Sequence, residues 1–399
     1  MALVLLILLV ILIILFDKKY YKTIYTPSVI LSVPFLIICF MYMFNSKYLG
    51  FKSLNYDVLY IWVFGLFFFW LTGIFTNILV PIKLYKLNVE ENKVSIYKYS
   101  EKVINISFFL AIILTYFLIQ SYFIYLSKGG EEVEEYLGKG IQAHLFIILK
   151  LLSILSFLSI LGKGNKIFKL KNLYIIFISL ALSIMYATKS GILILIISYF
   201  FAWVLFYNKK IKLWHIITAL ILGFGVFYLT YSIAFGELAP ISFIWRHMLL
   251  YYVSGISSMS AYFSMNNSVG IEWEMLYRFP INLINLLSGN SEDVKVGFSN
   301  EWTYIGNETT VNVKTFFGTI YLYGGFWIGI FSCCFFSFFC HLFFKMSKGR
   351  NSLIFLVLYC YLLAVLCFGW FDFYFNSLVF YESIFIAIIF NFIIINKKI

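Results

Sequence analysis

Long apolar runs separated by short polar segments follow one another along almost the whole chain, and this pattern predicts membrane-spanning helices. The runs approach or exceed the length that crosses about 30 Å of hydrocarbon, and they lack the alternation of a membrane β-strand. We therefore predict an all-α, polytopic integral membrane protein with eleven spans and one long external loop. The predicted spans are residues 2–16, 28–44, 57–81, 103–127, 143–161, 172–187, 190–207, 213–235, 316–344, 352–369 and 374–395.

One stretch, residues 236–315, is too polar to lie in hydrocarbon and is rich in aromatic side chains. It divides a single membrane domain, residues 1–399, into eight N-terminal spans (1–235), the long loop, and three C-terminal spans (316–399). Loops carry function more often than the elements that position them, so we expect the chemistry here. Residues 244–263 are apolar but interrupted by charge, which predicts an amphipathic helix at the membrane interface.

The first apolar run, residues 2–16, is predicted to be a retained span rather than a cleaved signal peptide. No basic residue precedes it, and no clear small-residue cleavage site follows it.

The distribution of charge predicts which side of the membrane each loop occupies. A net charge of +12 would suit a nucleic-acid partner, but the basic residues are not gathered in a soluble module. One set of alternate loops holds 20 of the 30 Lys and Arg residues and 4 of the 18 acids, and the opposite set holds 9 and 13. By the positive-inside rule, the N-terminus and the long loop lie outside and the C-terminus inside. We expect no nucleic-acid partner.

Arginine is rare in this chain, and its placement is informative. Only three residues are Arg, against 27 Lys, yet Arg246 and Arg278 both lie in the long outer loop, where positive charge is disfavoured. The guanidinium fork binds phosphate or carboxylate through two parallel hydrogen bonds, which lysine cannot do. The two arginines are therefore candidate phosphate ligands, and structural pairing with loop glutamates is the alternative.

Further candidates surround these arginines in the sequence. His247 is a potential general base, because its ordinary pKa lies near neutrality, although a structural hydrogen bond explains it equally well. Glu237 and Glu272 are outer carboxylates with the same potential. Lys189 lies at an outer helix turn, where it either grips a phosphate or extends to lipid headgroups. Tyr251 and Tyr252 are flat faces on which a sugar ring can stack.

The chain lacks the familiar signatures of nucleotide, dinucleotide and zinc binding. We predict no cofactor and no metal. An enzyme of this kind working outside needs a substrate that arrives already activated, and a sugar carried on a lipid pyrophosphate meets that requirement.

Several motifs resemble those of the Wzy-type O-antigen and capsule repeat-unit polymerases. The residues that carry the resemblance are Asp17-Lys18-Lys19 with Tyr25-Thr26-Pro27-Ser28, Lys189-Ser190-Gly191, Tyr251-Tyr252-Val253-Ser254-Gly255 with Ala261-Tyr262-Phe263, Asn312-Val313-Lys314-Thr315 with Tyr321, Gly325 and Gly329, and Arg278 and Gly289 with ten residues between them. Where that family often has an Asp-Phe-Gly-like triplet, this chain has Tyr323-Gly324-Gly325, so no role for that acid is carried over.

The resemblance implies an inverting glycosyltransferase of the bacterial cytoplasmic membrane that acts on its outer face in O-antigen (lipopolysaccharide) or capsule synthesis. Such an enzyme moves a growing glycan from undecaprenyl pyrophosphate onto a new lipid-linked repeat unit. Arg246, Arg278 or Lys189 would stabilise the departing pyrophosphate, and His247 or a loop glutamate would deprotonate the acceptor. Asn312 is implied to contact substrate. Membrane lipids, a flippase and a chain-length regulator are the implied partners.

Two alternatives remain open. An O-antigen ligase has similar topology but transfers finished glycan to a lipid core. A lipid-linked-oligosaccharide flippase would be expected to show evenly short loops, internal repeats and charges within its spans. Here Lys150 and Glu382 are the only charged residues that lie clearly inside predicted spans, since Asp57 lies at the very start of its span.

Overall fold

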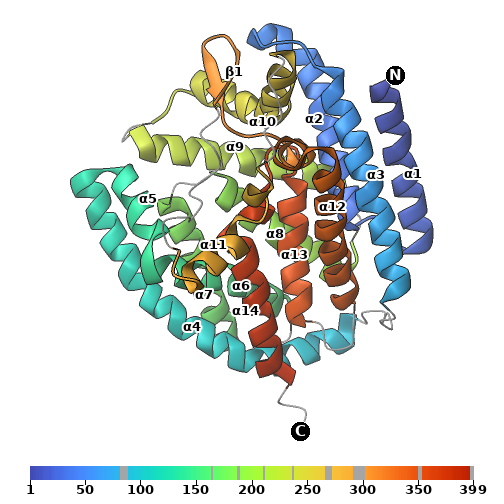
Figure 1. Ribbon diagram of the computed structural model, residues 1–399. Coiled ribbons are helices and arrows are strands. Elements are labelled where there is room, and N and C mark those ends of the chain that lie inside the picture. Colours follow the sequence, from blue (N-terminus) through green and yellow to red (C-terminus); the bar gives the residue numbers. More distant parts are fainter. Residues whose placement is uncertain are drawn as a thin grey trace. The chain divides into compact units, whose positions relative to one another are not determined.

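The computed structural model describes residues 1–80, 89–162, 165–186, 189–209, 212–235, 238–265, 272–290, 302–348 and 353–395. Helices dominate these residues (Figure 1). They are α1 (Ala2–Tyr20), α2 (Pro27–Leu49), α3 (Tyr56–Leu79), α4 (Val89–Lys128), α5 (Gly130–Gly138), α6 (Gly140–Leu161), α7 (Lys166–Met185), α8 (Lys189–Tyr207), α9 (Leu213–Phe235), α10 (Ile241–Ser264), η1 (Trp273–Met275), α11 (Arg278–Leu287), α12 (Phe316–Met346), α13 (Leu353–Cys367), η3 (Tyr374–Asn376) and α14 (Leu378–Ile395).

Each predicted span overlaps a helix, and the prediction of an all-α membrane protein is confirmed. Within the described residues, seven helices are long and apolar enough to cross a membrane: α2, α3, the part of α4 from Ser100 to Lys128, α6, α7, α8 and α12. Shorter apolar helices occur at Ile221–Ser232, Leu353–Cys367 and Leu378–Ile393. The count of eleven spans stays a prediction.

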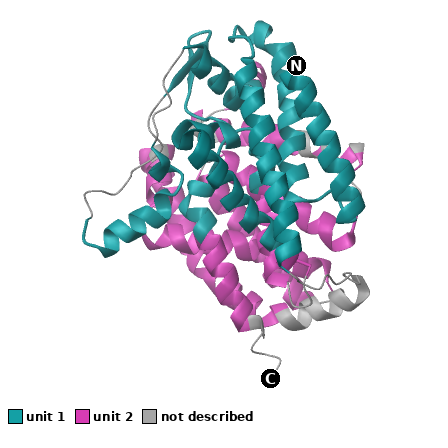
Figure 2. Cartoon of the chain, turned by 45° about the vertical axis from the view of Figure 1, so that its right-hand side comes forward, with its two compact units in different colours: residues 1–81, 249–344, 365–381 teal, residues 82–248, 345–364, 382–399 magenta. Residues whose placement is uncertain are grey.

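The chain forms two compact units, each assembled from separate stretches of sequence (Figure 2). Unit 1 comprises residues 1–81, 249–344 and 365–381, and unit 2 comprises residues 82–248, 345–364 and 382–399. The units therefore cut across the predicted division of the chain at residues 235 and 315.

In unit 1, α1 packs against α2 and α3. The indole of Trp62 in α3 stacks on Phe35 of α2 with ring centroids 3.5 Å apart, and its N–H donates to Thr315 Oγ1 at 3.1 Å. At the start of α2, the Thr26 hydroxyl donates to the buried Asp17 carboxylate at 2.5 Å, and Pro27 occupies the first turn, where its missing N–H costs nothing. These contacts explain the first motif of the resemblance structurally.

In unit 2, the Leu- and Ile-rich helix α6 packs against α4, α7 and α8. Its buried serines supply hydrogen bonds between helices, which helps to hold apolar helices together where no hydrophobic effect drives their association. Ser159 donates to Ser100 Oγ in α4 at 3.2 Å, and Ser153 bonds to the Tyr199 hydroxyl in α8 at 2.8 Å.

The stretch predicted as a long loop is largely folded where it is described. The helix predicted for residues 244–263 is confirmed as α10, but residues 253–262 are buried without interruption, so half of α10 is enclosed by protein rather than presenting one free face. Downstream, β1 (Thr303–Gly306) and β2 (Thr309–Val311) form an antiparallel hairpin that the sequence analysis did not predict. Its turn, Asn307 and Glu308, has positive φ at both positions, as a type I′ turn requires.

Candidate functional site

Two residues singled out separately in the sequence, Lys189 and His247, both contact the ring of Tyr231. All three belong to unit 2. The Lys189 ammonium lies 4.2 Å from the centroid of the Tyr231 ring, and the His247 imidazole meets the same ring edge-on with centroids 5.2 Å apart. Lys189 begins α8, Tyr231 lies near the end of α9, and His247 lies in the second turn of α10. Three helix ends thus assemble a cluster that we call the Tyr231 cluster.

The hydrogen bonding of His247 defines which of its nitrogens is able to accept a proton. Its Nδ1 lies 3.3 Å from the Phe243 carbonyl oxygen. Because a carbonyl only accepts, Nδ1 carries the proton in this contact, and in the neutral ring Nε2 keeps its lone pair. Burial lowers the pKa of His247, and the charges of Lys189 and Arg246 lower it further, against the opposing effect of the Phe243 bond. The ring is therefore neutral at physiological pH, as a general base must be.

The charge of the Tyr231 cluster is predominantly positive. Arg246 is exposed beside His247, and Lys189 is half-buried, so an incoming anion has access to a guanidinium and an ammonium. The exposed Glu134 of α5 interacts electrostatically with Lys189 and partly offsets the positive charge. Cations next to aromatic faces suit a ligand that combines a phosphate with a sugar ring.

Unit 1 contains a different polar arrangement, which we call the Lys314 cluster. The Lys314 ammonium is buried and donates to Ser258 Oγ at 2.8 Å and to Thr303 Oγ1 at 2.6 Å. Asp372 lies next to it: its carboxylate accepts from the Phe373 backbone N–H at 2.8 Å and from the backbone N–H of Lys314. Burial raises the pKa of Asp372 to about 6, although these bonds and the charge of Lys314 pull it down.

The Lys314 cluster joins two motifs of the sequence analysis that lie sixty residues apart. Gly255 of α10 faces backbone: a Cβ there would lie 2.5 Å from the Trp370 carbonyl oxygen, so only glycine permits this approach. Just before it, Tyr251 stacks on Phe371 with centroids 4.3 Å apart, and Tyr252 packs on Trp370 at 5.3 Å. Tyr251 and Tyr252 are thus already engaged with protein rings, which favours a structural role over sugar stacking.

Of the remaining predicted site residues, Arg278, Glu272 and Asn312 belong to unit 1. Arg278 is the half-buried first residue of α11 in unit 1, and burial lowers its pKa. Glu272 precedes η1 and is exposed, and Asn312 is exposed just after β2. Glu237 lies outside the described residues. Within the part of the chain that the structure describes, no three His, Cys, Asp or Glu side chains are grouped to hold a metal.

No role for Tyr231 or Asp372 follows from the sequence alone, and Lys314 enters only as part of the motif Asn312-Val313-Lys314-Thr315. A second signal was available for Lys314: like Arg246 and Arg278, it is a basic residue on the side that is predicted to face outward, where the charge rule disfavours positive charge. Asp372 is one of several acids in the predicted outer loops, and nothing in its sequence context ranks it above the others. Tyr231 lies in an apolar run among many aromatic residues, and only the fold reveals its neighbours.

The described fold and clusters define a helical membrane protein with polar clusters built around helix ends. The chain belongs to a family of unknown function (DUF6337), whose model matches residues 50–398. No curated protein and no solved structure is detectably similar to it.

Proposed function

We propose that this protein is a glycosyltransferase of the bacterial cytoplasmic membrane that polymerises undecaprenyl-pyrophosphate-linked repeat units into O-antigen or capsular polysaccharide. The observation that carries the proposal is the meeting of Lys189 and His247 at the Tyr231 ring. Residues chosen from the sequence for two halves of one reaction, anion stabilisation and proton removal, lie within one cluster. The motif resemblance supports the same reaction.

In the proposed reaction, the acceptor hydroxyl attacks the anomeric carbon of the donor from the face opposite the pyrophosphate. The new C–O bond forms as the bond to the phosphate oxygen breaks, and the configuration inverts. His247 Nε2 takes the hydroxyl proton, and undecaprenyl pyrophosphate leaves with the bonding electrons. Lys189 and Arg246 stabilise the negative charge that develops on the leaving group. The lowered pKa of His247 keeps it unprotonated, so polymerisation is expected to persist below pH 6.5 and to fall only at more acidic pH.

Replacing Lys189 by Met, in the native host at normal expression, tests the proposal. The ammonium is lost and the length of the side chain is kept. We expect a loss on the order of 10²- to 10³-fold in polymerisation rate, the effect of removing one transition-state donor. The measurement is the polymer ladder on gels, together with lipid-linked intermediates. Lys139→Met is the matched control, because Lys139 is an exposed lysine that pairs with Glu135 within one helical turn and should be dispensable.

The intermediate that accumulates separates the three candidate functions. A polymerase defect leaves single repeat units on the carrier at the outer face. A ligase defect leaves finished polymer on the carrier, and a flippase defect leaves single units facing the cytoplasm. A wild-type ladder in Lys189→Met would show that the Tyr231 cluster is not the reaction site.

A further inference from the structure

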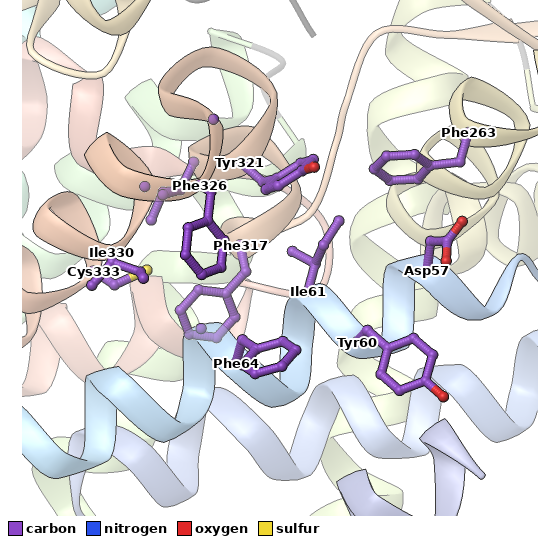
Figure 3. Close-up of a pocket in the computed structure, with 14 residues that line it drawn as sticks. Asp57, Tyr60, Ile61, Phe64, Phe263, Phe317, Tyr321, Phe326, Ile330 and Cys333 are labelled. Atoms are coloured by element: carbon purple, nitrogen blue, oxygen red, sulfur yellow. The ribbon is translucent and has the colours of Figure 1, made fainter. Parts of the chain in front are cut away.

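A cavity of about 380 Å³ lies within unit 1 between α3 and α12, with Phe263 of α10 at one end (Figure 3). Its size falls in the range of small-molecule sites, roughly 300–1,000 Å³. The α3 residues that line it are Asp57, Tyr60, Ile61, Phe64 and Gly65, whose spacing of three and four places them on one face of the helix. A Cβ at Gly65 would lie 2.4 Å from the Phe317 ring, so glycine allows Phe317 to form the cavity wall.

The opposite wall contains a break in α12. Gly325 has φ 60° and ψ −155°, a conformation that belongs to glycine, and it separates the helix into two segments. Gly325 and Gly329 both line the cavity, where the absence of side chains leaves space. The break and the cavity therefore occupy the same part of the helix.

Among the described residues that line the cavity, the one charged side chain lies at one end. Figure 3 shows Asp57 at one end with Phe263, and Ile330 and Cys333 at the other, with Phe64 and Phe317 between them. The Asp57 carboxylate is exposed, and among the described residues that line the cavity there is no Lys, Arg or His. A carboxylate without a lining cation repels phosphate and attracts an ammonium group.

The surroundings identify where an occupant comes from. Both α3 and α12 are apolar and long enough to cross the membrane. Beside the cavity, α12 also carries exposed apolar side chains, with Trp327 79% and Phe331 64% exposed, which is typical of a surface in contact with lipid. An apolar cavity between such helices faces the lipid chains of the bilayer. We therefore expect its occupant to be a lipid.

We propose that this cavity binds one hydrocarbon chain of a membrane lipid whose headgroup carries an ammonium, held against Asp57. The apolar lining takes the chain, and the end at Asp57 takes the headgroup. This site is independent of the proposed glycosyl transfer, and its charge is opposite to that required for a pyrophosphate.

The test uses the full-length protein in nanodiscs that contain a phosphatidylethanolamine with a photoactivatable group in its acyl chain. A parallel sample contains phosphatidylglycerol with the same chain, and the labelled peptides are mapped by mass spectrometry. We expect labelling of the α3 and α12 segments that line the cavity. Phosphatidylethanolamine should label them about twofold to fivefold more than phosphatidylglycerol, the range of an exposed ion pair. Asp57→Asn should abolish that preference and keep the labelling.

Substitutions that fill the cavity provide the second arm of the experiment. Ile330→Trp places a large ring in the lining and should remove most of the labelling, whereas Ile328→Trp, two residues earlier on the same helix and outside the lining, should leave it intact. Ile61→Trp fills the cavity from α3 and serves if Ile330→Trp lowers the thermal stability. Unlabelled cavity peptides, equal labelling by the two lipids in the wild type, or labelling that survives both cavity-filling variants would overturn the proposal.

Discussion

The Tyr231 and Lys314 clusters each contain a lysine on the side of the chain predicted to face outward, but the two lysines have different environments. Lys189 is half-buried over an aromatic ring beside an exposed arginine and a histidine. Lys314 is buried, and its ammonium donates to two hydroxyls. The charge of Lys189 is accessible to a ligand. The hydrogen bonds of Lys314 instead hold α10 and β1 to the segment before α12. A basic residue that opposes the charge rule therefore marks either a binding group or an internal brace.

Because the two lysines differ in this way, replacing each of them is expected to have a different effect. Removing an accessible cation should affect activity and leave stability nearly unchanged, because an exposed interaction contributes little to folding. Removing a buried cation should affect stability, because its partners stay behind without hydrogen bonds.

The largest effect is expected in a labelling experiment that tests on which side of the membrane the clusters lie. We expect an impermeant thiol reagent to label Asn290→Cys in intact cells, and to label Lys166→Cys only after the cells are permeabilised. Both positions are exposed, and the charge distribution places the first outside and the second inside. Labelling of the wild-type protein gives the background signal from its six native cysteines, which are buried or half-buried. The reverse pattern would place both clusters on the inner face and remove the basis of the proposed function.

The largest effect on activity is expected at the arginines. Arg246→Lys and Arg278→Lys keep the charge and lose the planar fork, so each should slow polymerisation on the order of 10²- to 10³-fold if it holds the donor pyrophosphate. The readout is the distribution of polymer length. Arg246 belongs to unit 2 and Arg278 to unit 1, so the pair distinguishes the two regions. A strain impaired only by Arg278→Lys would move the reaction site away from the Tyr231 cluster.

Much of the fold is predictable from the sequence, because apolar runs in a bilayer have few options other than helices. The boundaries agree closely. The predicted span 213–235 has the bounds of α9, and the predicted span 316–344 starts with α12 and ends two residues before the end of that helix. The break at Gly325 was not predicted, because Tyr323-Gly324-Gly325 reads as part of an apolar run. The β1–β2 hairpin was missed for a related reason, since Asn307-Glu308 lacks the glycine that usually marks a type I′ turn.

The candidate site was predictable only in part. Lys189, Arg246 and His247 stand out because their chemistry is unusual for an outer turn or loop. Tyr231 and Asp372 acquire their roles from neighbours supplied by distant segments, and no local pattern contains that information. The same applies to Tyr251 and Tyr252, whose composition suggested sugar stacking until Phe371 and Trp370 were found against them.

A smaller effect, on stability, is expected at Lys314. Lys314→Met leaves the Ser258 and Thr303 hydroxyls without this donor, and an orphaned buried polar group costs about 1–3 kcal/mol. We expect a lower melting temperature for the purified protein in nanodiscs. Lys189→Met is the control, with a melting temperature close to that of the wild type. If the two variants melt alike, the two lysines do not differ as argued above.

The opposite effect, a gain in stability, is expected on replacing Asp372, where burial raises the pKa from 3.8 to about 6. Because the folded state binds this proton more tightly than the unfolded state, the stability of the wild type should increase as the pH falls from about 6 to about 4. Above pH 6 the carboxylate is charged in both states, and its burial disfavours folding. Asp372→Asn removes the charge and keeps an oxygen that accepts a backbone hydrogen bond. The variant should therefore melt higher than the wild type at pH 7.5.

The pH dependence of that difference distinguishes a desolvated charge from an ordinary polar contact. The gain in melting temperature of Asp372→Asn should shrink below pH 6 and vanish near pH 4, where the wild-type carboxyl is protonated in the folded protein as well. Groups other than residue 372 titrate in both proteins, so they largely cancel in the comparison. A variant less stable at pH 7.5 would show that hydrogen bonds to the carboxylate outweigh its burial. Asp372 would then resemble Lys314 as an internal brace. A charged group that a protein keeps at a cost to stability marks a candidate site of chemistry, and this part of unit 1 would lose that mark.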